Sequence, residues 1–249
     1  MAASTTGPAH WTPRLWRWHR WLAWLVALQV AAWVVGGVLF AWLPFQAWVK
    51  SADSVAKPSA ALPAGWNEAL GRARLPGAPV LSVASVATAR GPAWQIRHPQ
   101  GPDTWLSATG APLVPPDEAA VAAFAQSLYR GAGRLAAVER VAEPPRRLGI
   151  VRETGKRADL WVARFDDTLA TRLYVDARSG QFVAARNEAW VLYDFFWRLH
   201  VMDYGDGEDF NNPLLRVAAL AALALVTTGA ALLVLSLRRR RRRSAAAAG

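Results

Sequence analysis

The sequence predicts a membrane-anchored α+β protein in which two transmembrane helices flank a domain outside the cytoplasm. Three observations support this fold class. Two long apolar runs lie near the ends of the chain, strand and helix patterns alternate in the polar region between them, and basic residues gather outside the runs. Together they divide the chain into a central domain and two membrane anchors.

Each apolar run is long enough to cross a bilayer. Residues 21–43 carry no charge, and residues 213–237 carry only Arg216 near their start. An α-helix needs about 20 predominantly apolar residues to cross a hydrocarbon core of ~30 Å. A cleaved signal peptide is the alternative for the first run. Such peptides have apolar stretches of roughly 7–15 residues and a small-x-small cleavage motif, which the sequence lacks here. We therefore expect a transmembrane helix in each run.

The position of the charges sets the expected orientation. The chain has a formal net charge of +11, yet all 18 acidic residues lie between Asp53 and Asp209, where basic residues nearly balance them. The excess comes from arginines before the first run and after the second. Cytoplasmic flanks of membrane helices are rich in Lys and Arg. We therefore expect a bacterial inner (cytoplasmic) membrane protein whose main domain is periplasmic and whose ends, residues 1–20 and 238–249, are cytoplasmic.

Six consecutive arginines at 238–243 have two interpretations. Arginines near a membrane surface are attracted to anionic lipid headgroups. RNA binding is the alternative, but no folded basic domain with stacking aromatic residues accompanies the run. We expect the lipid bilayer as a partner and no nucleic acid. The chain also has no cysteine, which excludes disulfides and thiolate metal sites.

The region between the runs is expected to hold a tether over residues 44–64 and an α+β domain over residues 65–188. Asp117 is the predicted N-cap of a helix with one apolar face, and a weaker helix is expected at residues 66–74. Short segments with strand character, separated by turn residues, predict seven strands. They are residues 80–87, 93–97, 104–107, 135–142, 160–165, 172–176 and 181–185.

A weak internal repeat relates the two halves of this domain. Residues 94–110, which end in Thr109-Gly110, are similar in pattern to residues 161–180, which end in Ser179-Gly180. Each copy reads as strand, turn, strand, Thr/Ser-Gly turn and strand, and a predicted helix precedes each one. Two helix-plus-antiparallel-sheet units side by side would form one domain of ordinary size.

Three segments resemble a known family. The segment LYVDARSGQFV resembles the closing hairpin of the PepSY domain, and RLWRWHRWLAWL resembles the first membrane helix of PepSY-associated membrane proteins. The segment FFWRLHVMDYGDGEDFNNPLLR resembles the junction before the last helix in a two-helix branch of that group. The resemblance implies that the two units of the domain are PepSY-like. Some larger relatives with four helices are implicated in haem-dependent reduction of iron–siderophore complexes.

Residues 189–212 are expected to form an aromatic interfacial helix followed by an acidic turn. Trp and Tyr are typical of the membrane–water boundary, and Asp194 is spaced to pair with Arg198 one helical turn away. At the end of the turn, an Asn-Pro pair suits the N-cap and first position of the second membrane helix. The residues given these interfacial and structural roles are Trp190, Asp194, Trp197, Arg198, Tyr204, Asn212 and Pro213.

Two histidines are candidate ligands of a b-type haem, which can take an axial imidazole on each face. His19 precedes the first run on the cytoplasmic side, and His200 precedes the second run on the opposite side. Because about 30 Å of hydrocarbon separates these levels, one chain cannot use both for one iron, although a homodimer could pair equivalent histidines. The simpler interpretation is that both are interfacial residues bonded to water, headgroups or backbone.

Oxygen-bearing side chains after His200 suggest a second candidate site. Asp203, Asp206, Glu208 and Asp209 offer the hard ligands that Ca²⁺ takes, but their spacing does not match an EF-hand loop. The alternative is a solvated acidic turn whose charges favour the positive end of the second helix.

The sequence contains no Gly-x-Ser-x-Gly elbow, His-Glu-x-x-His motif or phosphate-binding loop, so nothing in it indicates an enzyme. We expect a non-catalytic binding or accessory module that faces the periplasm, with no cofactor and with a membrane or periplasmic protein as partner. The alternative function is a haem-linked electron-transfer or iron-reduction subunit, which the family resemblance implies.

Overall fold

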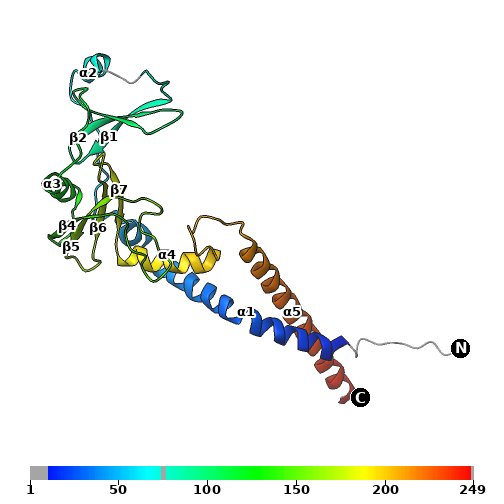
Figure 1. The fold of residues 1–249 in the computed structure, drawn as a ribbon. Coiled ribbons are helices and arrows are strands. Elements are labelled where there is room, and N and C mark those ends of the chain that lie inside the picture. The colour runs from blue at the N-terminus through cyan, green and yellow to red at the C-terminus, as the bar shows by residue number, and fades with distance from the viewer. Residues whose placement is uncertain (1–10, 74–76, 248–249) are drawn as a thin grey trace. The chain divides into compact units, whose positions relative to one another are not determined.

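A computed structural model describes residues 11–73 and 77–247 of the chain (Figure 1). The chain divides into two compact units, which are described separately. Unit 1 comprises Met1–Ala41 and Phe196–Gly249, and unit 2 comprises Trp42–Phe195. The expected fold class is confirmed: long apolar helices at both ends flank an α+β region with two antiparallel sheets.

Unit 1 contains two long helices, α1 (Trp11–Trp42) and α5 (Pro213–Ala247). The parts long and apolar enough to span a membrane are Pro13–Trp42 and Pro213–Arg241, with mean hydropathies of 2.1 and 2.4. Their apolar side chains are exposed, as at Leu28 (85%) and Val226 (68%). Hydrocarbon is the solvent that such a surface requires. Both helices run beyond the predicted apolar segments. Helix α1 also includes the basic residues before Trp21, and α5 also includes the arginines at 238–243.

A third helix, α4 (Glu188–Val201), joins unit 2 to the remainder of unit 1 along the chain. Its first turn is capped by Asn187, whose side-chain oxygen accepts a hydrogen bond from the Trp190 backbone N–H at 2.8 Å. Such a cap satisfies one of the otherwise unpaired N–H groups at a helix start. The helix ends at Val201, one residue before Met202, which has a positive φ of 54°.

Unit 2 contains two helix-plus-sheet halves, as the internal repeat predicts. In the first, α2 (Trp66–Arg72) precedes a sheet of order β1-β2-β3 formed by Ser82–Thr88, Gly91–Arg97 and Thr104–Ser107. In the second, α3 (Glu118–Leu128) precedes a sheet of order β4-β5-β6-β7. Its strands are Leu135–Val141, Leu160–Phe165, Arg172–Asp176 and Phe182–Arg186.

Local sequence signals account for the boundaries of the second half. The Asp117 side chain accepts a hydrogen bond from the Ala120 backbone N–H at 2.9 Å, and α3 begins at the next residue. This bond to the backbone lowers the pKa of the Asp117 carboxyl below its usual value. The apolar face of α3 packs on the sheet through Ala125 and Leu128, against residues such as Ala163 and Leu173.

The two halves differ at their fourth strand. Gly110 and Gly180 occupy matching turn positions with φ of +83° and +69°, a conformation that favours glycine. After Gly180 the chain forms β7, but after Gly110 only an isolated bridge forms between Leu106 and Pro112. Proline has no backbone N–H to donate to a sheet, and Pro115 and Pro116 follow it. The first half therefore stops at three strands.

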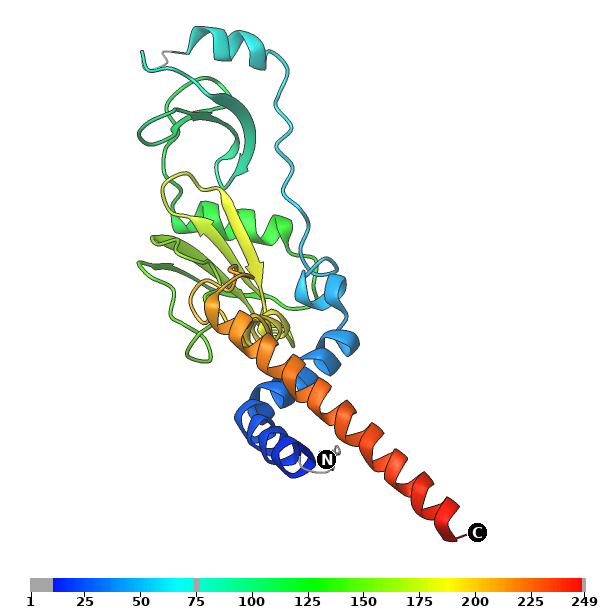
Figure 2. The ribbon, with the colours of Figure 1, turned by 90° about the vertical axis from the view of Figure 1, so that its right-hand side faces the viewer.

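The segment predicted as a tether is partly packed. A short π-helix, η1 (Phe45–Val49), follows α1, and Ser51 is fully buried. Val55 then forms a bridge with Tyr129, before the chain continues without regular structure to α2 (Figure 2). Buried apolar residues such as Val49 and Val55 fix this segment against the domain, so residues 44–55 are not a free linker.

Candidate functional site

The end of α4 is bound to the apolar run of α1. The last carbonyls of a helix lack partners within the helix. Here the Leu199 carbonyl accepts from Gln29 Nε2 at 2.8 Å, and the His200 carbonyl accepts from Trp33 Nε1 at 2.9 Å. The Val201 carbonyl accepts from Asn212 Nδ2 at 2.9 Å. Three successive carbonyls are thus satisfied by side chains, as a low-dielectric setting requires.

Aromatic contacts also join the second half of α4 to α1. The Phe196 ring packs against Gly36 of α1, where a Cβ atom added to the glycine would lie 3.6 Å from that ring. Trp197 lies beside Phe40, with ring centroids 6.3 Å apart. The second half of α4 therefore runs along the apolar part of α1, between Gln29 and Phe40. The sequence predicts an interfacial helix here, and the contact with α1 joins residues too distant in sequence to be seen in a local pattern.

His200 lies at an apolar pocket of about 460 Å³. Its ring stacks on Trp197, with centroids 6.2 Å apart and planes 9° apart, and lies 6.0 Å from the Trp33 ring. Phe210 closes another side, edge-on to Trp197. The full lining is Trp33, Trp197, His200, Val201, Phe210 and Leu215. No hydrogen bond joins either ring nitrogen of His200 to another residue in the described part of the chain.

The acidic turn is organised around Asp203. Its two carboxylate oxygens accept backbone N–H bonds from Gly205, Gly207, Glu208 and Asp209, at 2.9–3.1 Å. These bonds, that from Asp209 first, lower the pKa of the Asp203 carboxyl. Among the described residues, no three His, Asp or Glu side chains are placed to hold a metal ion. The geometry therefore does not gather Asp203, Asp206, Glu208 and Asp209 around a cation.

Arg198 holds the other side of the same turn. Arg198 is 3% exposed. Its guanidinium donates hydrogen bonds to the carbonyls of Gly205 (2.6 Å) and Asp206 (3.2 Å). Trp197 Nε1 donates to the Gly207 carbonyl at 3.1 Å. The pairing of Arg198 with Asp194 remains a prediction. Tyr204 is 40% exposed, and the Arg186 guanidinium lies 4.1 Å from the centroid of the Trp190 ring. The interfacial roles of both residues remain predictions.

The turn ends in the cap of α5. Asn212 Oδ1 accepts from the Leu215 backbone N–H at 2.9 Å, and Pro213 is the first residue of α5. The Asn212 amide also donates to Val201 and Asp209 carbonyls. One side chain thus closes the end of α4, the acidic turn and the start of α5.

His19 lies at a different level of unit 1. Its Nδ1 is 2.9 Å from Thr228 Oγ1, and a Cβ added to Gly229 would lie 3.0 Å from its Cε1. His200 contacts α1 at Trp33, 14 positions further along that helix. At 1.5 Å per residue the two levels are about 21 Å apart. One chain therefore does not bring His19 and His200 to a single haem iron.

Unit 2 contains a buried charge network that no local sequence pattern indicates. Arg172 and Glu153 are 3% and 4% exposed, and their closest N–O distance is 2.6 Å. Tyr174 donates its hydroxyl to the second Glu153 oxygen at 2.9 Å. Burial tends to lower the pKa of Arg172, but Glu153 and Glu188 outweigh it and raise that pKa. Burial, followed by Glu153, raises the pKa of Tyr174.

The network extends to the start of α4. Glu188 accepts from Arg147 at 2.8 Å and from Arg172 at 2.8 Å. Arg186 donates to the Glu153 carbonyl. Beside it, the Asn187 amide donates to the Trp48 carbonyl and the Ser51 hydroxyl. The entry of the chain into unit 2 and its exit are thus joined directly.

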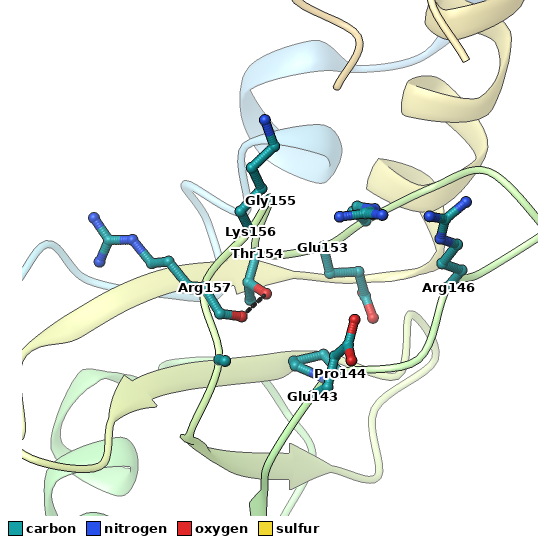
Figure 3. A pocket seen from close by; sticks show the side chains of 10 residues that line it. Glu143, Pro144, Arg146, Glu153, Thr154, Gly155, Lys156 and Arg157 are labelled. Carbon is teal, nitrogen blue, oxygen red and sulfur yellow. Dashed lines mark hydrogen bonds between the residues drawn. The ribbon is translucent and has the colours of Figure 1, made fainter. Parts of the chain in front are cut away.

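Next to this network, residues 143–158 line an open pocket of about 120 Å³ (Figure 3). Figure 3 shows Glu153 turned towards the pocket, while Lys156 and Arg157 extend away from the loop. Four basic side chains of this loop line the pocket, against two carboxylates. The loop is therefore a cationic surface above a buried acid. Its cations are Arg146, Arg152, Lys156 and Arg157.

Comparison with known proteins identifies the family. A model of the PepSY-associated TM region matches residues 16–248, nearly the whole chain. The chain belongs to the PepSY-associated TM region family. No curated protein and no solved structure matches it. This PepSY-associated TM protein is therefore a membrane protein with two candidate spans that flank a soluble domain.

Proposed function

We propose that this PepSY-associated TM protein is a non-catalytic binding or accessory module of a bacterial inner membrane. Unit 2 faces the periplasm, and both termini are cytoplasmic. The arginines before residue 21 and after residue 237, which flank the two apolar runs, support this orientation by the positive-inside rule. The partner is a membrane or periplasmic protein, and a second copy of the chain is the alternative.

The observation that carries the proposal is the way unit 2 is attached. The chain enters unit 2 from one candidate span and leaves it towards the other, and Asn187 bonds the exit to the entry at Trp48 and Ser51. These bonds hold together the two segments by which the chain enters and leaves unit 2. A domain preorganised in this way suits presentation of a binding surface.

The cationic loop at residues 143–158 is the surface we assign to the partner. Three of its arginines, Arg146, Arg152 and Arg157, have no side-chain hydrogen bond to other described residues. Arg is suited to carboxylate recognition because its planar guanidinium can donate two parallel hydrogen bonds. An acidic segment of a partner protein is the chemistry that this loop fits.

A photocrosslinking amino acid at Arg152 or Arg157 tests this assignment in cells. We expect one discrete adduct from each position, larger than the 27.1 kDa chain. The matched control is Arg72, an exposed arginine on α2 whose salt bridge partner Glu68 is also exposed. An adduct of twice the chain mass would identify a homodimer. Adducts of equal yield from all three positions, or none, would contradict the assignment.

A haem-linked electron-transfer subunit is the alternative function, and the pocket beside His200 is the observation that favours it. Since His19 and His200 lie at different levels of one chain, a bis-histidine haem b would need two copies. We expect the purified protein to show no Soret band. A stoichiometric Soret band that is lost in His200→Ala or His19→Ala would establish the alternative.

A further inference from the structure

The pocket beside His200 combines apolar side chains with one histidine, on a surface that faces lipid. Three aromatic side chains, Trp33, Trp197 and Phe210, and two aliphatic ones surround a single imidazole. His200 is exposed, and no described residue bonds its ring nitrogens. The imidazole is therefore open to a hydrogen bond from a bound molecule with a polar atom.

The lining restricts the chemistry of that molecule. It contains no Lys, Arg, Asp or Glu, so it offers no countercharge to a phosphate or a carboxylate. The nearby guanidinium of Arg198 is already bonded to the carbonyls of Gly205 and Asp206. A neutral ligand is therefore favoured. A neutral imidazole has one N–H donor and one acceptor nitrogen, so a carbonyl oxygen is a matching group.

The shape and location restrict it further. Aromatic walls favour a flat ring, which they can contact face-on or edge-on. A volume of about 460 Å³ lies within the range of small-molecule sites. Leu215, in the first turn of α5, and Trp33, within the apolar run of α1, place the pocket where the ligand arrives from the bilayer. The ligand must therefore be soluble in lipid.

We propose that this pocket binds the ring of a lipid-soluble quinone, with a ring carbonyl accepting a hydrogen bond from the His200 imidazole. The rings of Trp33, Trp197 and Phe210 contact the faces and edges of the quinone, and its isoprenoid tail lies among the lipids. The site belongs to unit 1. It is independent of the partner surface in unit 2 and of the orientation of the chain in the membrane.

The test uses the full chain in nanodiscs of synthetic, quinone-free phospholipid and a photoactivatable azido-quinone. Peptide mapping should place the label on the peptides around Trp33 and residues 197–215, and excess ubiquinone-1 should remove it. An octylbenzene competitor, which has a ring and a chain but no carbonyl, should compete at least tenfold less well. Because the nanodisc lipids are present in large excess, a site for phospholipid chains would give no competable label.

Variants locate the hydrogen bond. His200→Phe keeps an aromatic ring but removes the donor, and it should weaken ubiquinone-1 competition by about fivefold. His200→Gln retains an N–H donor and should lose less. Phe210→Ala, which leaves His200 in place, should also weaken competition. The matched control is His98→Phe in unit 2, where the imidazole bonds Pro79 and Thr104. It should bind as the wild type does.

Several results would overturn the proposal. Label spread evenly over the lipid-facing peptides of α1 and α5 would show partitioning without a site. Equal competition by ubiquinone-1 and octylbenzene, or His200→Phe binding like wild type, would remove the carbonyl contact. A Soret band lost in His200→Phe would assign the pocket to haem. Only variants whose melting temperature and gel-filtration elution volume match those of the wild type are compared. If His200→Phe is misfolded, Phe210→Ala tests whether the pocket binds the quinone.

Discussion

Replacing Arg172 with Met should lower the free energy of unfolding by about 3–5 kcal/mol, because it leaves the buried Glu153 carboxylate without its counterion. Glu153 is 4% exposed, and both guanidinium bonds to it come from Arg172. Urea denaturation of the full chain in detergent, followed by far-ultraviolet circular dichroism, measures the change.

The matched control for that experiment is Arg164→Met. Arg164 pairs with Glu139 at 2.6 Å on the same sheet, but both side chains are more than 40% exposed. Such a surface pair contributes at most about 1 kcal/mol. Equal losses in the two variants would contradict the importance we give to the buried pair. A double variant, Arg172→Met with Glu153→Leu, should recover much of the stability because no unpaired charge remains.

Gln29→Leu should destabilise unit 1 by about 1–3 kcal/mol, because the Leu199 carbonyl loses its donor in an apolar setting. Adding Trp33→Phe removes the donor to the His200 carbonyl and should increase the loss. Thermal denaturation in detergent measures the stability. Protease cleavage within residues 203–209 reports separately on release of α4, since that turn follows the helix end.

Thr227→Ala is the control for these membrane-helix variants. Thr227 is exposed on α5, and its hydroxyl bonds only carbonyls of its own helix, at Leu223 and Ala224. It should change the melting temperature little. If Gln29→Leu melts like Thr227→Ala and the turn is no more readily cleaved, α4 is not held by α1 as described.

The parts of the fold that could be predicted depend on neighbours in sequence. The start of α3 follows from Asp117 and the helical spacing of the apolar residues after it. The Gly110 and Gly180 turns follow from residue types that accept a positive φ. Strands β3, β5 and β6 begin and end where alternation and turn residues indicate. The two spans follow from length and hydropathy alone.

The candidate site was less predictable because its contacts join distant residues. Arg172 and Glu153 are 19 positions apart, and nothing local shows that either is buried. Ser51 and Asn187 are 136 positions apart, so a segment rich in Ala and Ser resembled a free tether. Gln29 did leave a signal. It is the single strongly polar residue between residues 21 and 43, where a side chain needs a partner.

The acidic turn had two interpretations from sequence, a cation site and a solvated turn before the second helix. In the structure Asp203 uses its oxygens to bond four backbone N–H groups. Asp and Asn commonly organise turns in this way. Spacing gives no information on whether a carboxylate faces outward or folds back on its own backbone.

The orientation of the chain is the central claim, and the absence of cysteine allows a direct measurement. Single variants Thr154→Cys, in the cationic loop, and Ser244→Cys, after the arginine run, are treated in intact spheroplasts with a membrane-impermeant maleimide. We expect labelling of Thr154→Cys at once and of Ser244→Cys only after the membrane is permeabilised. Labelling of Ser244→Cys in intact spheroplasts, with Thr154→Cys protected, would contradict the account.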